Sequence, residues 1–584
     1  MSTIASANEK PLEWPNLTAP IDLRSNPDAV QWGRWRFAEN VRSTEKGQLI
    51  RREGWRSFGY QTGHPNSDLH AHTAGSPVRS LYVHPGRGGK AGSRLFAGTT
   101  SDVWMNRADG GWSNMLDGQS GGKWSFASVG SILVACNGKT AVWTRVGGPD
   151  RMAPIPSLAD IDVSAASVCW EFQGTVFLAD VVMGGVRVRN RVVWAGQNSI
   201  EFVPTADNTA SFFEVNPCEQ ILVGVMVGTT FMVFTTHGHW RLGVQDGAFV
   251  WQNVYYSKER VGCLIDPAAI AVNRGVAFIV ASDGIYTVTP FSAAPEWTEW
   301  INDGLPDGFV PQNSTCAIEA AVFDPLRSEV WFSCPSAGQT FVIDTRHGSS
   351  SVIDKAWTAL VAADLFRSDD VAMWWVRSGI CTPERVIAFF GSHELDDDRV
   401  WPDAEGTATG CTPFDPPCSE CSSSYELVGA SADDRCLKFI DPDYFSRDMR
   451  VAGSVVAQAY GSRLVTGSLN FGTQEWKRFT RTIVEFIAAQ TDLPGKLSLR
   501  VGVSASAVDP LSQGCRRVWV FSQKTMACAA VSEMDHPNGQ PADWTFVVEG
   551  RYVFFDIRVE SVIGAPVTFT RFSVGASRSP NSTP

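Results

Sequence analysis

The sequence predicts an all-β protein: a β-propeller of about six to seven blades, with an N-terminal extended arm and a C-terminal β-sandwich-like domain. Three observations predict this class. The chain holds 22 Trp and 33 Phe among many short Val/Ile-rich runs, and such side chains suit a pleated, half-buried surface. Its 52 Gly supply the positive φ angles of tight turns. A hairpin unit also recurs along the chain, as is typical of repeat architectures.

Length and composition indicate a globular protein with more than one folding unit. Of the 584 residues, 44% are hydrophobic and 19% are charged, which is too apolar for a mainly disordered chain. The length predicts two to four units unless one is a large closed β architecture. The net charge of −12 argues against a protein that grips phosphates, because such binding needs a basic surface. An acidic wall would instead repel passing DNA.

The sequence shows no secretory signal and no membrane span. Residues Met1–Trp14 lack a basic segment followed by an apolar one, so we expect synthesis in the cytoplasm. The most apolar stretch, Ile221–Phe234, contains Gly and Thr and is shorter than the roughly 20 residues that a spanning helix requires. We interpret it as a buried hairpin and expect no membrane contact.

Residues 1–60 are predicted to form an arm. Prolines at positions 11, 15, 20 and 27 interrupt any regular element. Several Trp rings in this segment require burial, either on the chain's own body or on a neighbouring subunit. The candidate subunit-contact residues are Trp32, Trp35, Arg51, Arg52 and Trp55.

Residues 61–405 are predicted to form the propeller. A short apolar strand, a turn and a second strand with an aromatic residue recur about every 40 to 55 residues, the period of a four-stranded blade. Blades packed radially bury faces that one hairpin exposes. The six instances are Leu95–Phe96 with Trp104, Leu133–Val134 with Trp143, Val176–Phe177 with Trp194, Phe231–Met232 with Trp240, Ala277–Phe278 with Tyr286, and Val330–Trp331 with Phe341. A seventh is Ile387–Phe390 with Trp401.

Residues 406–449 are predicted to form an irregular connector, rich in Asp, Ser, Pro and Cys. Its four cysteines suggest one candidate cofactor, a structural zinc ion, because four thiolates complete a closed tetrahedron. Free thiols or a late-formed disulfide are the alternatives. The candidate ligands are Cys411, Cys418, Cys421 and Cys436.

The other cysteines lie mostly alone in apolar strands, for example Cys136, Cys169 and Cys334. A free thiol there behaves as a small hydrophobe. The count of 13 is odd, and we expect no disulfide scaffold.

Residues 450–575 are predicted to form the β-sandwich-like domain, and residues 576–584 a flexible tail. The expected strands are Lys496–Val503, Arg516–Phe521, Trp544–Val548, Tyr552–Glu560 and Val567–Val574. Turn signals such as Pro494–Gly495 and Pro537–Gly539 separate them.

Four short phrases resemble the tail nozzle family of short-tailed bacteriophages, also known as tail tubular protein B or packaged-DNA stabilisation protein. The first is Ala38–Arg42 followed by Gly47–Trp55, similar to the opening segment of that family. Asn190–Ala195 with Ser199–Phe202, and Val261–Cys263 through Asp283–Tyr286, resemble its blade phrases. Gly472–Arg478 resembles the start of its C-terminal β region.

The resemblance implies a structural virion protein: a hexameric ring in the tail that forms part of the DNA ejection channel and retains packaged DNA. Its implied partners are further copies of itself, the head-to-tail adaptor ring, tail fibre or needle proteins, and double-stranded DNA in transient, non-specific contact. No catalytic constellation is visible in the sequence, so we expect no enzymatic activity.

Two other functions remain open. One is a glycan-binding or glycan-cleaving tail protein, since Asp109–Trp112 is similar to part of the Asp-box turn of sialidase-type propellers. The complete turn and a set of paired carboxylates for glycoside chemistry are not evident. The other is a non-viral propeller that serves as an interaction scaffold.

Overall fold

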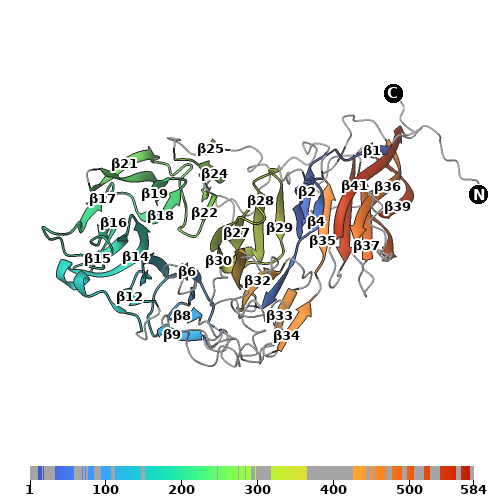
Figure 1. The fold of residues 1–584 in the computed structure, drawn as a ribbon. Coiled ribbons are helices and arrows are strands. Elements are labelled where there is room, and N and C mark those ends of the chain that lie inside the picture. Colours follow the sequence, from blue (N-terminus) through green and yellow to red (C-terminus); the bar gives the residue numbers. More distant parts are fainter. Residues whose placement is uncertain are drawn as a thin grey trace, which may run out of the picture.

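The computed structural model describes residues 11–15, 17–18, 33–57, 69, 73, 76–84, 94–106, 112–146, 151–245, 247–273, 275–282, 284–290, 296–297, 317–364, 425–433, 435–441, 447–451, 454–458, 460–466, 469, 477–488, 496–504, 518–525, 540–550, 552–560 and 567–578. Almost all of the described elements are strands. Figure 1 shows two parts side by side: a ring of small sheets, and a stack of longer strands that carries both chain ends.

Six sheets begin with four strands that follow one another in the chain and pair in that order, which is the construction of a propeller blade. The first three are β6–β9 (Ser80–His84, Arg94–Gly98, Val103–Asn106, Trp112–Leu116), β10–β13 (Ser125–Val129, Ile132–Cys136, Ala141–Arg145, Ala153–Pro154) and β14–β17 (Val163–Phe172, Thr175–Met183, Val186–Trp194, Ser211–Glu214).

The next three blades continue this pattern. They are β18–β21 (Ile221–Val227, Thr230–Thr235, Gly238–Gln245, Ala248–Tyr256), β22–β25 (Ile270–Asn273, Val276–Ala281, Gly284–Val288, Glu296–Trp297) and β26–β29 (Ala320–Asp324, Glu329–Cys334, Gln339–Asp344, Ser350–Ile353). Two short 3-10 helices, η3 (Pro156–Ile161) and η4 (Pro335–Ala337), lie between strands.

The six recurring hairpins of the sequence are the central strand pairs of these six blades. In blade 3, for example, Phe177 on the second strand lies opposite Trp194 on the third. In blade 5, Ile279 lies opposite Tyr286. The second strands are buried because the two neighbouring blades cover both faces of each blade. The predicted fold class, an all-β propeller built from recurring hairpins, is therefore confirmed.

A seventh blade combines distant parts of the chain. Its first three strands are β30 (Trp357–Asp364), β31 (Tyr425–Ser431) and β32 (Leu437–Asp441), and its fourth is the N-terminal β5 (Gly54–Ser57). One expectation changes, and one stays untested. Strands β31 and β32 occupy part of the segment predicted to be an irregular connector. The expected seventh hairpin, Ile387–Phe390 with Trp401, lies outside the described residues.

The seven first strands form a closed ring. Strand β6 contacts β10, β10 contacts β14, and the series continues through β18, β22 and β26 to β30, which contacts β6 again. Hydrogen bonds join neighbouring blades: the Thr358 hydroxyl donates to the carbonyl of Val78, and the Trp124 amide donates to the Ser80 hydroxyl at 2.9 Å. The protein is therefore a seven-bladed propeller, at the upper end of the predicted number.

The C-terminal strands form two sheets that share the N-terminal segment. One sheet has the order β3-β4-β41-β36-β39, with β1 on β41; the other includes β2-β35-β40-β37-β38. Phe555 of β40 meets Phe572 of β41 at 5.5 Å between the sheets. The bounds are β1 Pro11–Glu13, β2 Trp35–Glu39, β3 Val41–Ser43, β4 Leu49–Arg51, β35 Ser462–Thr466, β36 Lys477–Ala488, β37 Lys496–Ser504, β38 Val518–Thr525, β39 Gln540–Gly550, β40 Tyr552–Glu560 and β41 Val567–Arg578.

The N-terminal segment connects the sandwich to the propeller. Strand β2 pairs with β29 of blade 6 on one side and with β35 on the other, so one nine-stranded sheet crosses both parts. Strands β33 (Arg447–Val451) and β34 (Ser454–Gln458) extend blade 7 beyond β5. Residues 1–60 were expected to form a separate arm, but five strands lie within them. This segment is therefore part of both folded units.

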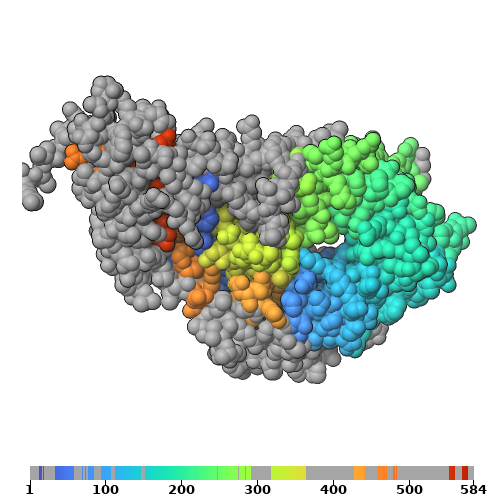
Figure 2. Space-filling view, turned by 180° about the vertical axis from the view of Figure 1, so that it is seen from behind, coloured from blue at the N-terminus to red at the C-terminus, as the bar shows by residue number. Residues whose placement is uncertain are grey.

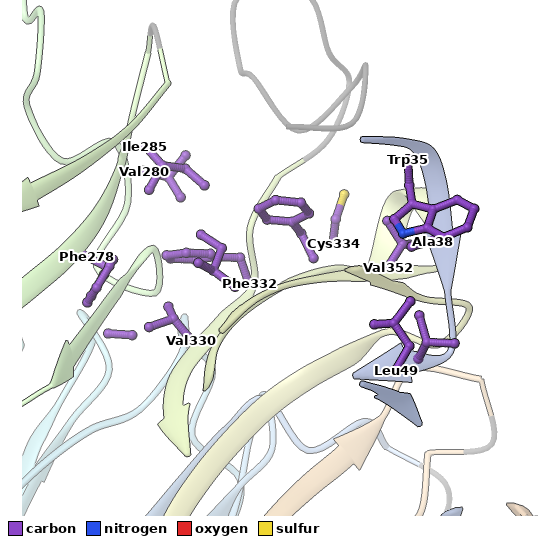
Figure 3. Close-up of a cluster of buried hydrophobic side chains, with 14 of the residues drawn as sticks. Trp35, Ala38, Leu49, Phe278, Val280, Ile285, Val330, Phe332, Cys334 and Val352 are labelled. Atoms are coloured by element: carbon purple, nitrogen blue, oxygen red, sulfur yellow. The ribbon is translucent and has the colours of Figure 1, made fainter. Parts of the chain in front are cut away.

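The largest hydrophobic core follows the same path. Figure 3 shows it running from Phe278 of blade 5 through Phe332 of blade 6 to Trp35 and Leu49 of the N-terminal strands. Each of these four side chains is buried. Because side chains pack closely across this region, the two parts are held by a common core as well as by the shared sheet.

One glycine tests the packing at the outer edge of blade 4. A Cβ at Gly238 would lie 1.9 Å from the backbone oxygen of Tyr255 on the paired strand β21, so backbone must move. We expect Gly238→Ala to lower the free energy of unfolding by about 1–3 kcal/mol. Gly243→Ala, on the same strand β20, meets nothing within 4 Å and is the matched control. Urea unfolding of both variants measures the difference; equal values would contradict this close approach of the two strands.

Candidate functional site

The hollow at the centre of the propeller is the candidate functional site. It measures about 240 Å³, and each of the seven first strands, or the residues just before it, contributes to its wall. Figure 2 shows the hollow where the blue, green and yellow blades meet. Its volume lies just below the roughly 300–1,000 Å³ of pockets for drug-sized ligands. The space therefore suits a smaller molecule.

Three charged side chains line this hollow: Arg79 before β6, Lys123 before β10, and Glu319 before β26. The ammonium of Lys123 in blade 2 donates a hydrogen bond to the backbone oxygen of Glu319 in blade 6, on the other side of the ring. Burial lowers the pKa of Lys123, and Arg79 acts in the same direction, whereas Asp266 and Glu319 oppose the change. The Lys123 side chain thus crosses the hollow.

A second polar cluster lies between blade 6 and the N-terminal segment. The guanidinium of Arg52 donates to both carboxylate oxygens of Glu329, at 2.6 and 3.1 Å, and stacks over the Trp331 ring. The Trp331 indole donates to the same carboxylate at 3.1 Å. Arg52 and Glu329 are 2% and 1% exposed. A bidentate pair shielded from water in this way fixes geometry, so the cluster positions the arm segment.

Glu53 extends this cluster. Its carboxylate accepts hydrogen bonds from Arg42 at 2.8 and 3.0 Å and lies 3.5 Å from Arg327. Burial would raise the pKa of Glu53, but Arg327 and Arg42 outweigh it and lower the pKa to about 2. Glu53 is therefore charged at neutral pH and neutralises the buried guanidinium of Arg327 and the partly buried guanidinium of Arg42.

The candidate subunit-contact residues need correction. Trp35, Arg51, Arg52 and Trp55 are buried within the chain itself. Trp35 stacks with Trp14 at 4.6 Å, and Arg51 donates to the backbone oxygen of Tyr460 at 2.6 Å. These four side chains join the chain's own parts because its two units fold around them, so they do not face a neighbouring subunit. Trp32 lies outside the described residues.

The cysteines give a mixed result. Cys136 and Cys169 are free and buried, as expected. Cys334 is disulfide-bonded, so the expectation of a free thiol is wrong at that position. Of the four candidate zinc ligands, Cys436 is buried, and Cys411, Cys418 and Cys421 lie outside the described residues. Within the described part of the chain, no group of three or more His, Cys, Asp or Glu side chains could hold a metal ion. The zinc site stays a prediction.

Glu39 of β2 lies where the nine-stranded sheet passes from blade 6 to the sandwich. Burial, reinforced by Asp354, raises its pKa from 4.5 to about 7, although Arg463, Arg447 and Arg558 act in the opposite direction. A raised pKa means that the folded state binds more protons between these two values. The stabilising contribution of protonated Glu39 is therefore complete below about pH 4.5, and it is lost as the pH rises through 7.

We expect Glu39→Gln to remove this pH dependence. In the wild type, Glu39 should reduce the free energy of unfolding by about 1–3 kcal/mol between pH 5 and pH 7.5. In the variant, the free energy of unfolding should no longer show this decrease with pH. Urea unfolding at both pH values measures it, with Glu201→Gln, an exposed position, as the control. An unchanged slope would show that Glu39 titrates normally.

The comparisons with known proteins concern the fold alone. No family model and no curated protein matches the sequence. Among solved structures, the Cps50 (Swd1) β-propeller domain of Myceliophteria thermophila is 11% identical, covers 49% of this chain and 89% of its own, and has a TM-score of 0.32. Apo AztD from Citrobacter koseri is 12% identical (46% and 71% covered, TM-score 0.30). A gluconolactonase from Xanthomonas campestris is 14% identical (46% and 92% covered, TM-score 0.27).

The strand pairing defines the class of this protein: a seven-bladed β-propeller fused to a β-sandwich through a shared N-terminal segment. Among the described residues, no helix is long and apolar enough to cross a membrane.

Proposed function

We propose that this protein is a scaffold that forms a ring in the tail of a short-tailed bacteriophage, as part of the DNA ejection channel. The observation that carries the proposal is the nine-stranded sheet shared by propeller and sandwich. A ring subunit must hold neighbours on different faces at fixed positions, and a continuous sheet with a common core limits movement between its parts. The phrases that resemble the tail nozzle family supply the particular setting.

The size of the central hollow determines where DNA could pass. The major groove of B-DNA alone is about 12 Å wide. The hollow has a volume of only about 240 Å³, and the Lys123 side chain crosses it, so it is too narrow for a duplex. Double-stranded DNA therefore cannot pass through the propeller, and a DNA channel has to lie between subunits. The net charge of −12 would keep DNA from adhering to its wall. A structural rather than catalytic role is part of this proposal.

Electron microscopy of virions that carry the chain, combined with labelling by an antibody fragment against it, tests the proposal. We expect the label on a ring in the tail, with closed rotational symmetry; sixfold order is expected from the resemblance. The purified protein should also assemble when mixed with virion particles that lack it. A chain absent from virions and monomeric at all concentrations would contradict the proposal. A monomer that binds oligosaccharide would favour the glycan-binding alternative.

A further inference from the structure

The charged groups around the central hollow carry both signs, and the two signs meet where the Lys123 ammonium reaches across to the backbone of Glu319. Blades 1 and 2, which are neighbours, supply the cations Arg79 and Lys123. Blade 6 supplies Glu319. Asp266, which precedes the first strand of blade 5, is not part of the lining but interacts with Lys123. Lys123 interacts with both carboxylates. A molecule in the hollow would therefore meet positive and negative charge close together, where Lys123 reaches Glu319.

Most of the polar capacity of these groups is unused by the described part of the chain. No described residue forms a side-chain hydrogen bond or ion pair with the Arg79 guanidinium or the Glu319 carboxylate. An ammonium has three donors, and Lys123 directs one to the Glu319 backbone. Asp266 accepts one bond, from the Ala268 amide at 2.8 Å. The hollow thus offers a guanidinium, two ammonium donors and a carboxylate to a ligand.

The remaining wall of the hollow is largely aliphatic. Leu81, Val168, Leu222, Ile270 and Leu360 come from five different blades. Small-molecule sites combine such apolar walls with a few placed polar groups. Interactions between charges are also stronger in a partly enclosed space than in water. A small molecule that carries an aliphatic group and two opposite charges would complement the lining of the hollow.

We propose that the central hollow binds a small zwitterion, an aliphatic α-amino acid, with its carboxylate at Arg79 and Lys123 and its ammonium at Glu319. A simple anion would leave the Glu319 carboxylate without a partner and would be repelled by it. A simple cation would be repelled by Arg79 and Lys123. Only a ligand that carries both charges close together is attracted to both kinds of group. The site is independent of the proposed ring assembly.

Isothermal titration calorimetry with leucine tests the proposal on the full-length protein. The matched controls are 4-methylpentanoate, which lacks the ammonium, and 3-methylbutylamine, which lacks the carboxylate. We expect leucine to bind with a dissociation constant of about 1 mM or tighter. Both controls should bind at least roughly tenfold more weakly, because each loses a hydrogen-bonded charge.

Two variants assign the binding to the named residues. Lys123→Met should weaken leucine binding by roughly tenfold or more. Glu319→Gln should weaken leucine and strengthen 4-methylpentanoate, because it removes the repulsion of an anion. The matched control is Arg151→Met, at a position 55% exposed on the surface of blade 2, which should bind leucine as the wild type does. Thermal unfolding confirms that each variant is folded.

Three results would overturn the proposal: no binding heat with leucine up to about 10 mM, equal affinities for leucine and 4-methylpentanoate, or unchanged leucine affinity in folded Lys123→Met and Glu319→Gln. Equal affinity for the carboxylate would define the hollow as an anion site. These results leave the tail assignment untouched, since the ring is tested on virions.

Discussion

Glu329→Gln should lower the free energy of unfolding by about 3–5 kcal/mol. The substitution leaves the Arg52 guanidinium buried without its counter-charge, because Glu329 is its bidentate partner and both groups are almost completely shielded from water. It also weakens the acceptor of the Trp331 indole. Calorimetric or urea unfolding of the purified variant measures the loss.

The surface pair Arg151–Asp117 provides the matched control. Its members lie 2.8 Å apart but are 55% and 66% exposed. Pairs in water contribute about 0–1 kcal/mol, so Asp117→Asn should change little. If Glu329→Gln were as mild as Asp117→Asn, the cluster at the blade 6 junction could not be what positions the N-terminal segment.

Trp55→Ala should cost about 3–5 kcal/mol. Trp55 lies on β5, the strand that completes blade 7, and is 1% exposed. Its ring meets Trp357 at 4.1 Å and Trp331 at 5.6 Å. Removing it leaves a cavity between blades 6 and 7, beside the N-terminal strand that completes blade 7.

Phe212→Ala is the control for an exposed ring, since Phe212 on the outer strand of blade 3 is 59% exposed. We expect its effect to stay within about 0.5 kcal/mol. Thermal unfolding and limited proteolysis should both separate the two variants. Comparable stabilities would mean that packing of Trp55 does not hold β5 in blade 7.

The recurring hairpins were predictable because their signals are local. Alternation of apolar residues, a turn and an aromatic on the returning strand lie within a few tens of residues, as in Val276–Val288. The C-terminal strand Tyr552–Glu560 has the predicted bounds for the same reason. Local side-chain period and turn chemistry are properties of the sequence itself.

The candidate site was not predictable in this way. Arg79, Lys123 and Glu319 lie far apart in the sequence, and only the closure of the ring brings them to one hollow. The one available signal was positional: each precedes the apolar first strand of a blade by one or two residues. Charged residues at such positions are common in loops, so the signal gains meaning only when blades 1, 2 and 6 are arranged around one axis.

By itself, the sequence determined that the chain is all-β, that it builds six hairpin-based blades, and that further strands follow them. The tertiary structure alone decided that β5 completes the seventh blade, that β1–β4 enter the sandwich, and that Arg51, Arg52, Trp35 and Trp55 are internal. The physical reason is that pairing between strands hundreds of residues apart depends on which edges and apolar faces remain uncovered once the local hairpins have formed.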